Sequence, residues 1–501
     1  MGGSTLQGPS IDWVSLSPLL VLLGGAMVLL VVGALTPLWP KRLYALFTAA
    51  VATTAGVLGV VLWHQVDREG PTTLVKDALT LDKMSVWLLI TVAVALVMAS
   101  FITDDYLRRE GLDGPEVYAM YLLAAIGGVV MGAANDLIVL FLGLEILSIA
   151  LYVLAASHRK RIESQESGLK YFVLGGFSSA IFLYGVALVY GATGTTNLRK
   201  VLAAFAATTG LENSDEALVL AGVALMLVGL MFKVAAVPFH FWTPDVYQGA
   251  PTPVTGFMAS AAKAAAFVAM LRVLLGALPA WSDDYRPVVW VLTVLTLVGG
   301  SVMAVVQTSV KRMLAFSSVS HAGFMLVGVE AAVQSINPSN PVTNDGSSSV
   351  LLYTLIYAVL VGGTFAVVTA VGRTGDGATD LAGFRGLGRT KPVLALAMTV
   401  LLLAQAGVPL TSGFIAKFNV IAAAVNVQSY AVAIIAMVAA VIAAFLYLRI
   451  MISMWVADAE AGDDAREPVR VPALLGVTIA ISVVFTLAIG VYPSPLLDIV
   501  P

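Results

Sequence analysis

Runs of about twenty apolar residues, separated by short polar segments, recur along the whole chain. Each run is long enough to cross a bilayer as a helix. We count fourteen of them, at 16–36, 43–63, 85–103, 117–134, 136–156, 171–191, 217–237, 254–275, 287–307, 312–331, 350–371, 393–425, 430–456 and 471–491. The twelfth is too long for one straight helix and contains Gly407, Pro409 and Gly413, so a broken helix is predicted there. The pattern therefore predicts an all-α integral membrane protein with about 14 transmembrane helices.

The composition excludes a soluble protein. Of the 501 residues, 59% are hydrophobic and only 11% are charged, and the mean hydropathy is +0.94. A soluble protein carries about 25% charged residues, because it must cover its outside with polar groups. The net charge of −3 gives no basic excess, so nucleic acid is not an expected partner.

The absence of cysteine limits the chemistry of the chain. Without a single cysteine, it has no disulfide, no thiolate zinc site and no cysteine-ligated iron–sulfur cluster. A phosphate-binding GxxxxGK[ST] loop is also missing from the sequence. Redox or nucleotide chemistry coupled to this chain is therefore expected on another polypeptide, and no cofactor or metal is expected in this one.

Lysines and arginines are distributed unevenly between the loops. The odd-numbered loops hold fifteen of them and the even-numbered loops hold six. Since basic residues accumulate in cytoplasmic loops, the odd loops are predicted to face the cytoplasm and both termini the outside. The apolar but short stretch 197–210 is predicted to lie at the outer interface as an amphipathic helix, and 335–349 is predicted to be a polar outer loop.

Seven charged side chains remain inside the spans or at their edges. Lys170, Arg272 and Arg449 lie near helix ends, where a long basic side chain can reach the interface. Charges at bilayer depth are costly and usually functional. Four have no such simple explanation: Glu145 and Lys263 at helix centres, and Lys233 and Lys417 beside helix breaks.

Two interpretations of these four charges remain open. A structural ion pair, most simply between Glu145 and Lys233, would leave two lysines unpaired in a medium of low dielectric constant. Alternatively, a buried lysine whose carboxylate partner moves nearer or farther binds a proton with adjustable affinity. Such groups, bridged by Ser, Thr, His and water, form a proton relay, which is the interpretation we favour.

Helix breaks recur at corresponding places in two parts of the chain. Four prolines between 238 and 253 forbid a continuous seventh helix, and the twelfth is broken near Pro409. Each is the fourth helix of a five-helix unit, helices 4–8 and 9–13, and an odd number of helices inverts the second unit. We therefore expect two inverted repeats, and divide the chain into 1–116, an N-terminal three-helix segment, 117–275 and 287–456, the two repeats, and 457–501, a C-terminal helix.

The four histidines fall into two groups. His64 and His158 lie at predicted interfaces and are expected to be solvated. His240 follows the first break, and His321 lies in the middle of helix 10 within Ser317-Ser-Val-Ser-His. A lone histidine on an apolar face is often a packing residue, but the neighbouring serines make His321 a weaker fifth candidate for the relay. Without a nearby acid, a histidine metal site is not expected.

These segments resemble a known family, the antiporter-like membrane subunits of respiratory complex I, the proton-pumping NADH:quinone oxidoreductase. The resemblance covers most of the chain and rests on FKVAAVPFHFWTPDVYQGAPTPVTGF at 232–257, SSVSHAGFM at 317–325 and AGVPLTSGFIAKF at 406–418. Among the three bacterial paralogues, L, M and N, it is most similar to subunit N. Subunit L carries a long lateral helix for which no room is expected after helix 14, and subunit M carries a glutamate where this chain has Lys417. The segment 166–180 also resembles subunit N.

The resemblance implies roles for the buried charges. Glu145 resembles the glutamate paired with the lysine of helix 7, here Lys233. Lys263 resembles the central lysine of helix 8, and Lys417 resembles the distal lysine that communicates with the outer side. Members of this family carry no redox centre, so FMN, iron–sulfur clusters and quinone are expected on other subunits.

The resemblance also implies the setting of the chain. It predicts a proton-translocating subunit driven by quinone reduction elsewhere, in the lipid bilayer of a bacterial cell membrane, with the L and M paralogues and small membrane subunits as partners. The alternative is a subunit of an Mrp-type Na⁺/H⁺ antiporter, which shares the fold and the buried charges.

Overall fold

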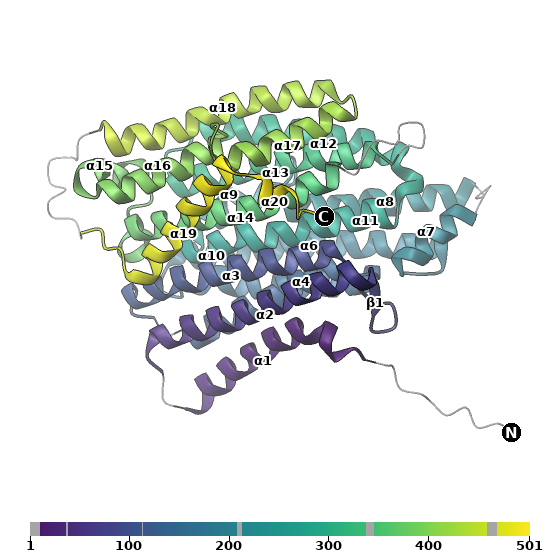
Figure 1. Cartoon of the computed structure of the whole chain (residues 1–501), viewed down its shortest axis with the longest axis horizontal. Helices are drawn as coiled ribbons and strands as arrows, with labels where there is room; N and C mark the ends of the chain where they lie inside the picture. Colours follow the sequence, from purple (N-terminus) through teal and green to yellow (C-terminus); the bar gives the residue numbers. More distant parts are fainter. Residues whose placement is uncertain (1–10, 37–38, 113, 208–212, 337–344, 458–467) are drawn as a thin grey trace.

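A computed structural model describes residues 11–36, 39–112, 114–207, 213–336, 345–457 and 468–501. Within these ranges the chain is almost entirely helical. The helices run roughly parallel to one another across Figure 1, with α7 and β1 at one end of the bundle and α15 at the other. Loops are therefore confined to two opposite sides, as expected for a protein that crosses a membrane repeatedly.

Thirteen helical segments of the described residues are long and apolar enough to cross a membrane. Before the first break these are α1 (Trp13–Leu35), α2 (Lys41–Glu69), α3 (Lys83–Arg109), α4 (Pro115–Ala133), α5 (Leu137–Ala155), α6 (Ile162–Thr193) and α8 (Asn213–Val234). The eighth span is composite, with α10 (Thr252–Phe257), the π-helix η1 (Met258–Ala262) and α11 (Lys263–Gly276). The others are α12 (Ser282–Val305), α13 (Val310–Gln334), α14 (Asp345–Gly372), α18 (Tyr430–Trp455) and α19 (Ala473–Val491).

The predicted twelfth span is divided into two short helices. They are α16 (Pro392–Ala406) and α17 (Ser412–Asn426). The described residues thus contain thirteen candidate spans and this pair of shorter apolar helices, in agreement with the prediction of about fourteen spans and of a break. Gly407 ends α16 in the left-handed region at φ +90°, a conformation that glycine adopts without steric penalty. A Cβ on Gly413 would lie 1.9 Å from the Ala404 carbonyl oxygen, so glycine is also needed where the two halves approach.

The break after α8 is also confirmed. Residues 235–241 are not helical, Ala235 has φ +63° and the Val237–Pro238 peptide bond is cis. The short helix α9 (Trp242–Gly249) follows. Protein groups satisfy the backbone here: Trp242 Nε1 donates to the Phe232 carbonyl at 3.0 Å, and the Val237 amide donates to Thr296 Oγ1 at 3.0 Å. Irregular backbone at membrane depth requires such partners.

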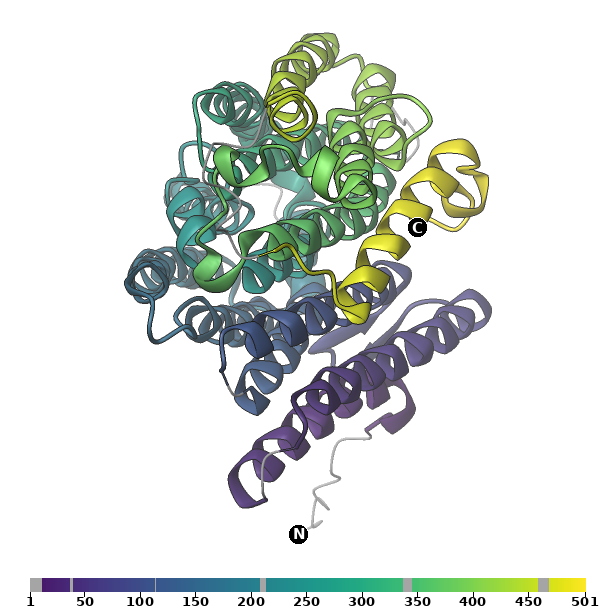
Figure 2. The same ribbon diagram turned by 90° about the vertical axis from the view of Figure 1, so that its left-hand side faces the viewer.

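Burial is greatest in α13 and α14, which lie between the two breaks. The apolar window of α13 is wholly buried and that of α14 almost so, whereas only 28% of the α1 window is buried. Figure 2 shows the same arrangement from one end, with α1 and α2 as a separate layer below the rest. Polar groups on α13 and α14 are therefore shielded from lipid by surrounding helices.

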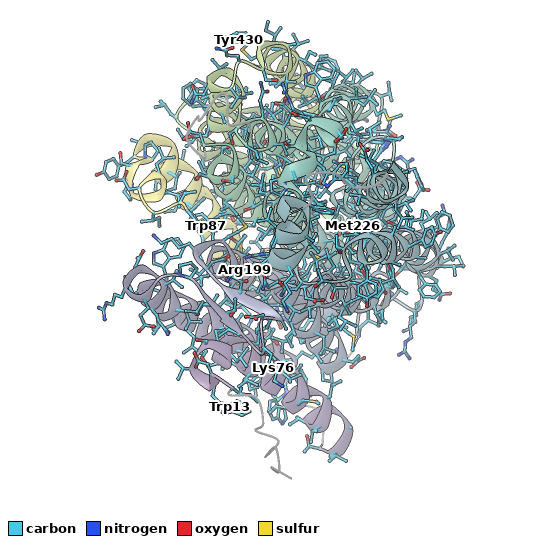
Figure 3. The ribbon with its side chains drawn as sticks, turned by 90° about the vertical axis from the view of Figure 1, so that its right-hand side faces the viewer. Trp13, Lys76, Trp87, Arg199, Met226 and Tyr430 are labelled. Atoms are coloured by element: carbon cyan, nitrogen blue, oxygen red, sulfur yellow. The ribbon has the colours of Figure 1, made fainter. Side chains whose placement is uncertain are left out.

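Several short elements lie at the two ends of the bundle. β1 (Thr72–Leu74) and β2 (Leu79–Leu81) form an antiparallel hairpin that the sequence did not predict. The others are α7 (Leu198–Ala207), η2 (Pro279–Trp281), η3 (Thr374–Asp376), η4 (Leu381–Phe384), α15 (Leu387–Thr390) and α20 (Ser494–Leu497). Lys76 of the hairpin turn and Arg199 of α7 lie on the side shown in Figure 3.

The outer segments were predicted only in part. The helix expected at 197–210 is present as α7, and residues 208–210 lie outside the described residues. The loop expected at 335–349 is wrong for 345–349, because α14 begins at Asp345, and residues 337–344 lie outside the description. Arg466, one of the loop residues used for the orientation, also lies outside it. The four-part division of the chain and the inverted relation of the two five-helix units stay predictions.

Candidate functional site

Lys233 occupies the last turn of α8, directly before the first break. Its side chain is buried, and its Nζ donates a hydrogen bond of 2.5 Å to Ser148 Oγ on α5. Ser148 Oγ in turn donates to the Leu144 carbonyl. The ammonium also lies 5.6 Å from the centre of the Tyr171 ring on α6, close enough for a cation–π interaction. One hydroxyl and one aromatic face thus hold the lysine among three helices.

Glu145 lies one turn before Ser148 on α5 and does not form the expected direct ion pair with Lys233. No nitrogen–oxygen contact within 4.0 Å joins them among the described side chains. The carboxylate is half-buried, and its Oε1 is buried without a hydrogen-bond partner in the described part of the chain. An unsatisfied buried carboxylate oxygen is costly, so this arrangement favours movement of the side chain or a bridging water.

Lys263 follows the π-helix η1 in the composite eighth span. π-bulges inside helices occur frequently at functional sites. The lysine is buried, and its Nζ donates to both the Ser318 carbonyl and Ser318 Oγ, the latter at 2.6 Å. The centre of the Tyr357 ring on α14 lies 5.8 Å away. No acid is paired with this lysine in the residues described.

His321 lies one turn after Ser318 and is held by two tyrosines. Its Nδ1 is 2.7 Å from Tyr353 Oη and its Nε2 is 3.1 Å from Tyr447 Oη. Tyr447 Oη also lies 2.6 Å from Ser317 Oγ. Both ring nitrogens thus have hydroxyl partners, each able to donate or accept, so a proton can be exchanged at either nitrogen without leaving an unpaired group.

Lys417 stands on α17, directly after the second break. Its Nζ donates to the Ala406 carbonyl, the last residue of α16, at 3.0 Å, and lies 4.6 Å from the centre of the Phe324 ring. The side chain is buried. A Cβ on Gly407 would lie 2.9 Å from Lys417 Cδ. The glycine therefore serves both the turn and the space that the lysine occupies.

One face of α13 brings three of the five candidates together. Ser318, His321 and Phe324 follow one another at intervals of three residues, so their side chains lie on the same face, about 4.5 Å apart along the axis. Lys263 contacts the first, Lys417 contacts the third, and His321 lies between. Glu145 and Lys233 form a separate group on α5 and α8, with no direct hydrogen bond to the α13 group among the described residues.

The interpretation of the three basic residues near helix ends is refined. Arg272 forms two hydrogen bonds to Asp82, of 2.9 and 3.0 Å, and a third to the Gly132 carbonyl at 2.6 Å. Lys170 lies 2.7 Å from Glu166 and 2.9 Å from Asp245, and Arg449 donates to carbonyls at the end of α12, including Gln307 at 2.9 Å. Each has polar partners near a helix end, so none requires a relay role.

A buried ionic cluster at the N-terminal end of α13 was not predicted from the sequence. Lys311 and Asp376 are both fully buried, 3.2 Å apart, and Lys311 also donates to the Ala250 carbonyl. Arg161 lies 3.0 Å from the same Asp376 oxygen, and the Thr252 amide donates to it at 3.3 Å. Burial alone would raise the pKa of Asp376, but Lys311 and Arg161 outweigh it and hold the pKa below its usual value.

His158 was expected to be solvated, and this expectation is wrong. The side chain is buried, and its Nδ1 lies 2.7 Å from Tyr106 Oη. Burial lowers the pKa of His158, and the nearby Glu110 only partly opposes this effect. Hydropathy places a residue at an interface but does not show whether neighbouring helices cover it, and here α3 covers it.

The amino-acid sequence of this chain is similar to those of known membrane proteins. Residues 134–443 match the family model described as NADH:quinone oxidoreductase/Mrp antiporter, transmembrane. The chain is 38% identical to NADH-quinone oxidoreductase subunit N 3 of Streptomyces griseus, over 99% of this chain and 95% of the relative. It is 46% identical to NADH-quinone oxidoreductase subunit N of Mycobacterium tuberculosis, over 78% and 72% of the two chains.

Solved structures are similar over almost the whole chain. A chain of respiratory complex I from Thermus thermophilus superposes with a TM-score of 0.78 and 31% identity, over 96% of this chain and 98% of that one. A chain of the Mrp complex from a Dietzia species superposes with a TM-score of 0.82 over 98% and 96% of the two chains. Its identity of 22% shows a shared fold alone.

Proposed function

Because the chain belongs to the NADH:quinone oxidoreductase/Mrp antiporter family, and within it to the subunit N proteins, we propose that its protons move through five titratable side chains, Glu145, Lys233, Lys263, His321 and Lys417. The chain is a proton-translocating membrane subunit of NADH:quinone oxidoreductase, complex I, and acts as part of a multi-subunit complex. The role of each residue is the proposal argued below.

The observation that carries the proposal is the order of contacts along α13. Lys263 hydrogen-bonds Ser318, and Lys417 lies against Phe324. His321 lies between them with a hydroxyl at each ring nitrogen. A proton released by Lys263 has acceptors in the Ser318 hydroxyl and bridging water, and His321 passes it toward Lys417. Packing alone does not require that three titratable groups meet at one buried face of α13.

Glu145 acts in the proposal as the movable charge at the start of the path. When its carboxylate approaches Lys233, Coulomb attraction stabilises the ammonium form, and when it withdraws, the buried lysine releases its proton more readily. The unpartnered Oε1 of Glu145 and the single side-chain hydrogen bond of Lys233 to Ser148 support such a change. Between Lys233 and Lys263, water molecules complete the path.

Partners and driving force follow from family membership. We place FMN, the iron–sulfur clusters and the quinone site on other subunits, so that quinone reduction there changes the position of Glu145 and its neighbours. The L and M paralogues and small membrane subunits are the proposed membrane partners. An Mrp-type Na⁺/H⁺ antiporter is the alternative, and it is supported by the shared fold and family model.

We place the complex in the bacterial plasma membrane with both termini of this chain in the periplasm. The support is the excess of lysine and arginine in the odd-numbered loops. A reporter that is active only in the cytoplasm, fused to the C-terminus, should give no signal, whereas the same reporter inserted after Lys160 should be active. An active C-terminal fusion would contradict this orientation.

The relay is tested by Lys263→Ala in the assembled complex. Proton pumping driven by NADH in membrane vesicles should fall strongly, because the central proton acceptor is lost. Lys200→Ala, which removes an exposed lysine of α7, is the matched control and should pump normally. Lys263→Ala complex that assembles and keeps the normal ratio of protons to electrons would refute the proposed path through this residue.

A further inference from the structure

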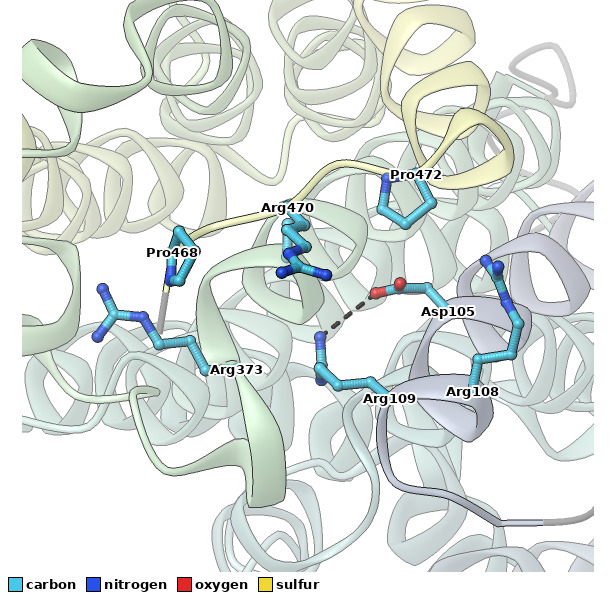
Figure 4. Close-up of a pocket in the computed structure, with 8 residues that line it drawn as sticks. Asp105, Arg108, Arg109, Arg373, Pro468, Arg470 and Pro472 are labelled. Carbon is cyan, nitrogen blue, oxygen red and sulfur yellow. Dashed lines mark hydrogen bonds and ion pairs between the residues drawn. The ribbon is translucent and has the colours of Figure 1, made fainter. Parts of the chain in front are cut away.

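A basic pocket lies where the last residues of α3 and α14 meet the segment that leads into α19. Its volume is about 380 Å³. Four arginines line it, Arg108, Arg109, Arg373 and Arg470, together with one acid, Asp105. Figure 4 shows Arg470 pointing from the segment toward Arg109, with Arg373 on one flank and Asp105 on the other. Outside the lining, Asp104 lies 2.9 Å from Arg108 Nη2 and Glu110 lies 3.6 Å from Arg109 Nε. Arg373 and Arg470 form no ion pair in the part of the chain that the structure describes, so the pocket keeps a positive excess that favours an anion.

The guanidinium groups have donors that the protein does not use. Arg109 Nη1 donates to the Thr369 carbonyl at 2.9 Å and lies 3.3 Å from Asp105. Its Nε and Nη2 are nevertheless buried without a hydrogen-bond partner among the described residues, and Arg373 Nε is in the same state. Glu110 lies 3.6 Å from Arg109 Nε, too far for a hydrogen bond. Buried unpaired guanidinium donors are unfavourable unless an external acceptor reaches them, and phosphate oxygens match their geometry.

An apolar groove begins on the other face of the same segment. Residues 468–472 are not helical, and successive side chains of an extended segment point to opposite faces. Arg470 and Pro472 line the basic pocket, whereas Val471 lines the groove. The groove has a volume of about 700 Å³ between α16 and α19 and is lined mainly by aliphatic side chains from Val393 to Val400 and from Gly476 to Leu487. It follows α19 for about 16 Å, given a rise of 1.5 Å per residue.

We propose that this pair of sites binds one anionic phospholipid from the adjacent leaflet, with its phosphate in the arginine pocket and an acyl chain in the groove. The basic pocket alone would fit any phosphate. The groove, which runs along membrane-spanning helices from the same segment, points to an occupant that also carries a hydrocarbon chain. Lys391 at the start of the groove adds a second cation near the membrane surface. Basic pockets between transmembrane helices are typical binding sites for anionic headgroups.

The proposal is independent of the proton path. None of the five relay residues lines the pocket or the groove. The bound lipid would anchor the segment before α19 against the ends of α3 and α14. These three segments are far apart in the sequence. A bound lipid would supply a negative charge to Arg373 and Arg470, which form no ion pair with an acid among the described residues.

The test uses the purified complex after lipid depletion in a neutral detergent. Dioctanoyl phosphatidylglycerol is titrated, and bound lipid is counted by mass spectrometry of the intact complex. The wild-type complex should retain one more phosphatidylglycerol than the double variant Arg373→Gln/Arg470→Gln, whose affinity at this site should be roughly tenfold or more weaker. Arg159→Gln removes an exposed arginine outside the pocket and should behave as wild type.

A second variant distinguishes a lipid from a free phosphate. Ala480 is an exposed groove residue of α19, so Ala480→Phe fills the groove and leaves every arginine in place. Ala480→Phe should weaken the retention of phosphatidylglycerol. Inorganic phosphate should still compete for the arginine pocket as it does in the wild type. Equal retention by the wild type and the double variant would overturn the proposal. So would full displacement of the lipid by an equal concentration of inorganic phosphate, because the acyl chain would then contribute nothing.

One further outcome identifies a different occupant. If the double variant fails to assemble with the neighbouring subunits while its isolated form retains phosphatidylglycerol as the wild type does, the pocket binds an acidic segment of a partner and not a lipid. In that case the charge-preserving variant Arg373→Lys/Arg470→Lys should restore assembly.

Discussion

Lys417 Nζ lies 3.0 Å from the carbonyl oxygen of Ala406 and so connects the two halves of a broken helix. The lysine stands near the start of α17, and the carbonyl ends α16. A cation at the carboxyl end of a helix interacts favourably with the helix dipole, and the Phe324 ring offers a second favourable contact. Both contacts favour the charged lysine, whereas its burial in a medium of low dielectric constant opposes it.

The first prediction separates a titrating Lys417 from a fixed positive charge. Lys417→Arg keeps the charge, but arginine does not deprotonate at physiological pH. If Lys417 only caps α16, arginine should serve and pumping should be normal. If it relays protons, NADH-driven pumping should fall nearly as far as in Lys417→Ala, with assembly preserved in each variant.

Lys417→Glu controls for the larger size of the guanidinium group. Glutamate titrates, and the resemblance noted above implies that subunit M carries glutamate at this position, so partial pumping is expected. Full pumping by Lys417→Arg, measured as fluorescence quenching of a proton-sensitive dye in vesicles, would rule out the titrating role.

The second prediction concerns Glu145 and its distance from Lys233. Glu145→Ala should lower pumping strongly, since Lys233 would lose the carboxylate that favours its charged form in a medium of low dielectric constant. Glu145→Asp should retain part of the activity. Glu145 makes no direct ion pair with Lys233 in the described structure. The free energy of unfolding of Glu145→Ala should therefore differ from that of the wild type by less than about 1 kcal/mol.

Ser148→Ala provides the matched comparison. It removes the hydroxyl that Lys233 contacts at 2.5 Å and leaves Glu145 in place. Pumping should fall less than in Glu145→Ala, since the lysine can still be controlled by the carboxylate. If Glu145→Ala complex pumps with the normal proton-to-electron ratio, Glu145 has no part in the relay.

The third prediction concerns the pH dependence of stability that Asp376 produces. Its pKa in the folded protein lies below the ordinary value of 3.8 because Lys311 and Arg161 outweigh the effect of burial. A carboxyl group with a lowered folded pKa stabilises the protein above its unfolded pKa, and this contribution is lost as the pH falls through the folded value. Wild-type stability should therefore decline from about pH 5 downwards.

Asp376→Asn tests this assignment. At pH 7 the variant should be destabilised by about 3–5 kcal/mol, because Lys311 remains buried without its carboxylate partner. The difference from wild type in thermal unfolding should become smaller as the pH is lowered from 6 to 3. A difference that stays constant over this range would show that Asp376 is not the titrating group.

The fold was predictable from the sequence because the bilayer imposes one strong requirement. Every backbone group must be satisfied within its own segment, so apolar length and proline position determine where helices begin and end. The fourteen spans and both breaks, at 235–241 and at Gly407, follow from this requirement. The β1–β2 hairpin does not, because its short strands lie outside the apolar runs. The helical start at Asp345 was missed because its polar residues are typical of a loop.

The site was predictable in its residues but not in its contacts. Glu145, Lys233, Lys263 and Lys417 are conspicuous because charges are rare in spans. Their hydroxyl partners are not, since serine and tyrosine are common in membrane helices. Tyr353 comes from α14 and Tyr447 from α18, and the paired Lys311 and Asp376 are separated by 65 residues. Only packing shows that these groups are buried together.

The last prediction concerns Gly407, where the turn and the relay depend on the same residue. Its φ of +90° is unfavourable for a residue with a side chain, and a Cβ would approach Lys417 Cδ to 2.9 Å. Gly407→Ala should therefore destabilise the protein by about 1–3 kcal/mol and displace Lys417 from the Ala406 carbonyl. Gly24→Ala is the control, because a Cβ there would meet nothing within 4 Å and a helical glycine gains stability on becoming alanine.

Gly407→Asn separates the two causes, since asparagine tolerates the left-handed conformation but is still too large for the space. If the displacement of Lys417 impairs the relay, both Gly407 variants should lose pumping, whereas the asparagine variant should be the more stable of the two in thermal unfolding. Normal pumping by a stably assembled Gly407→Ala complex would show that the position of Lys417 is not critical for proton transfer.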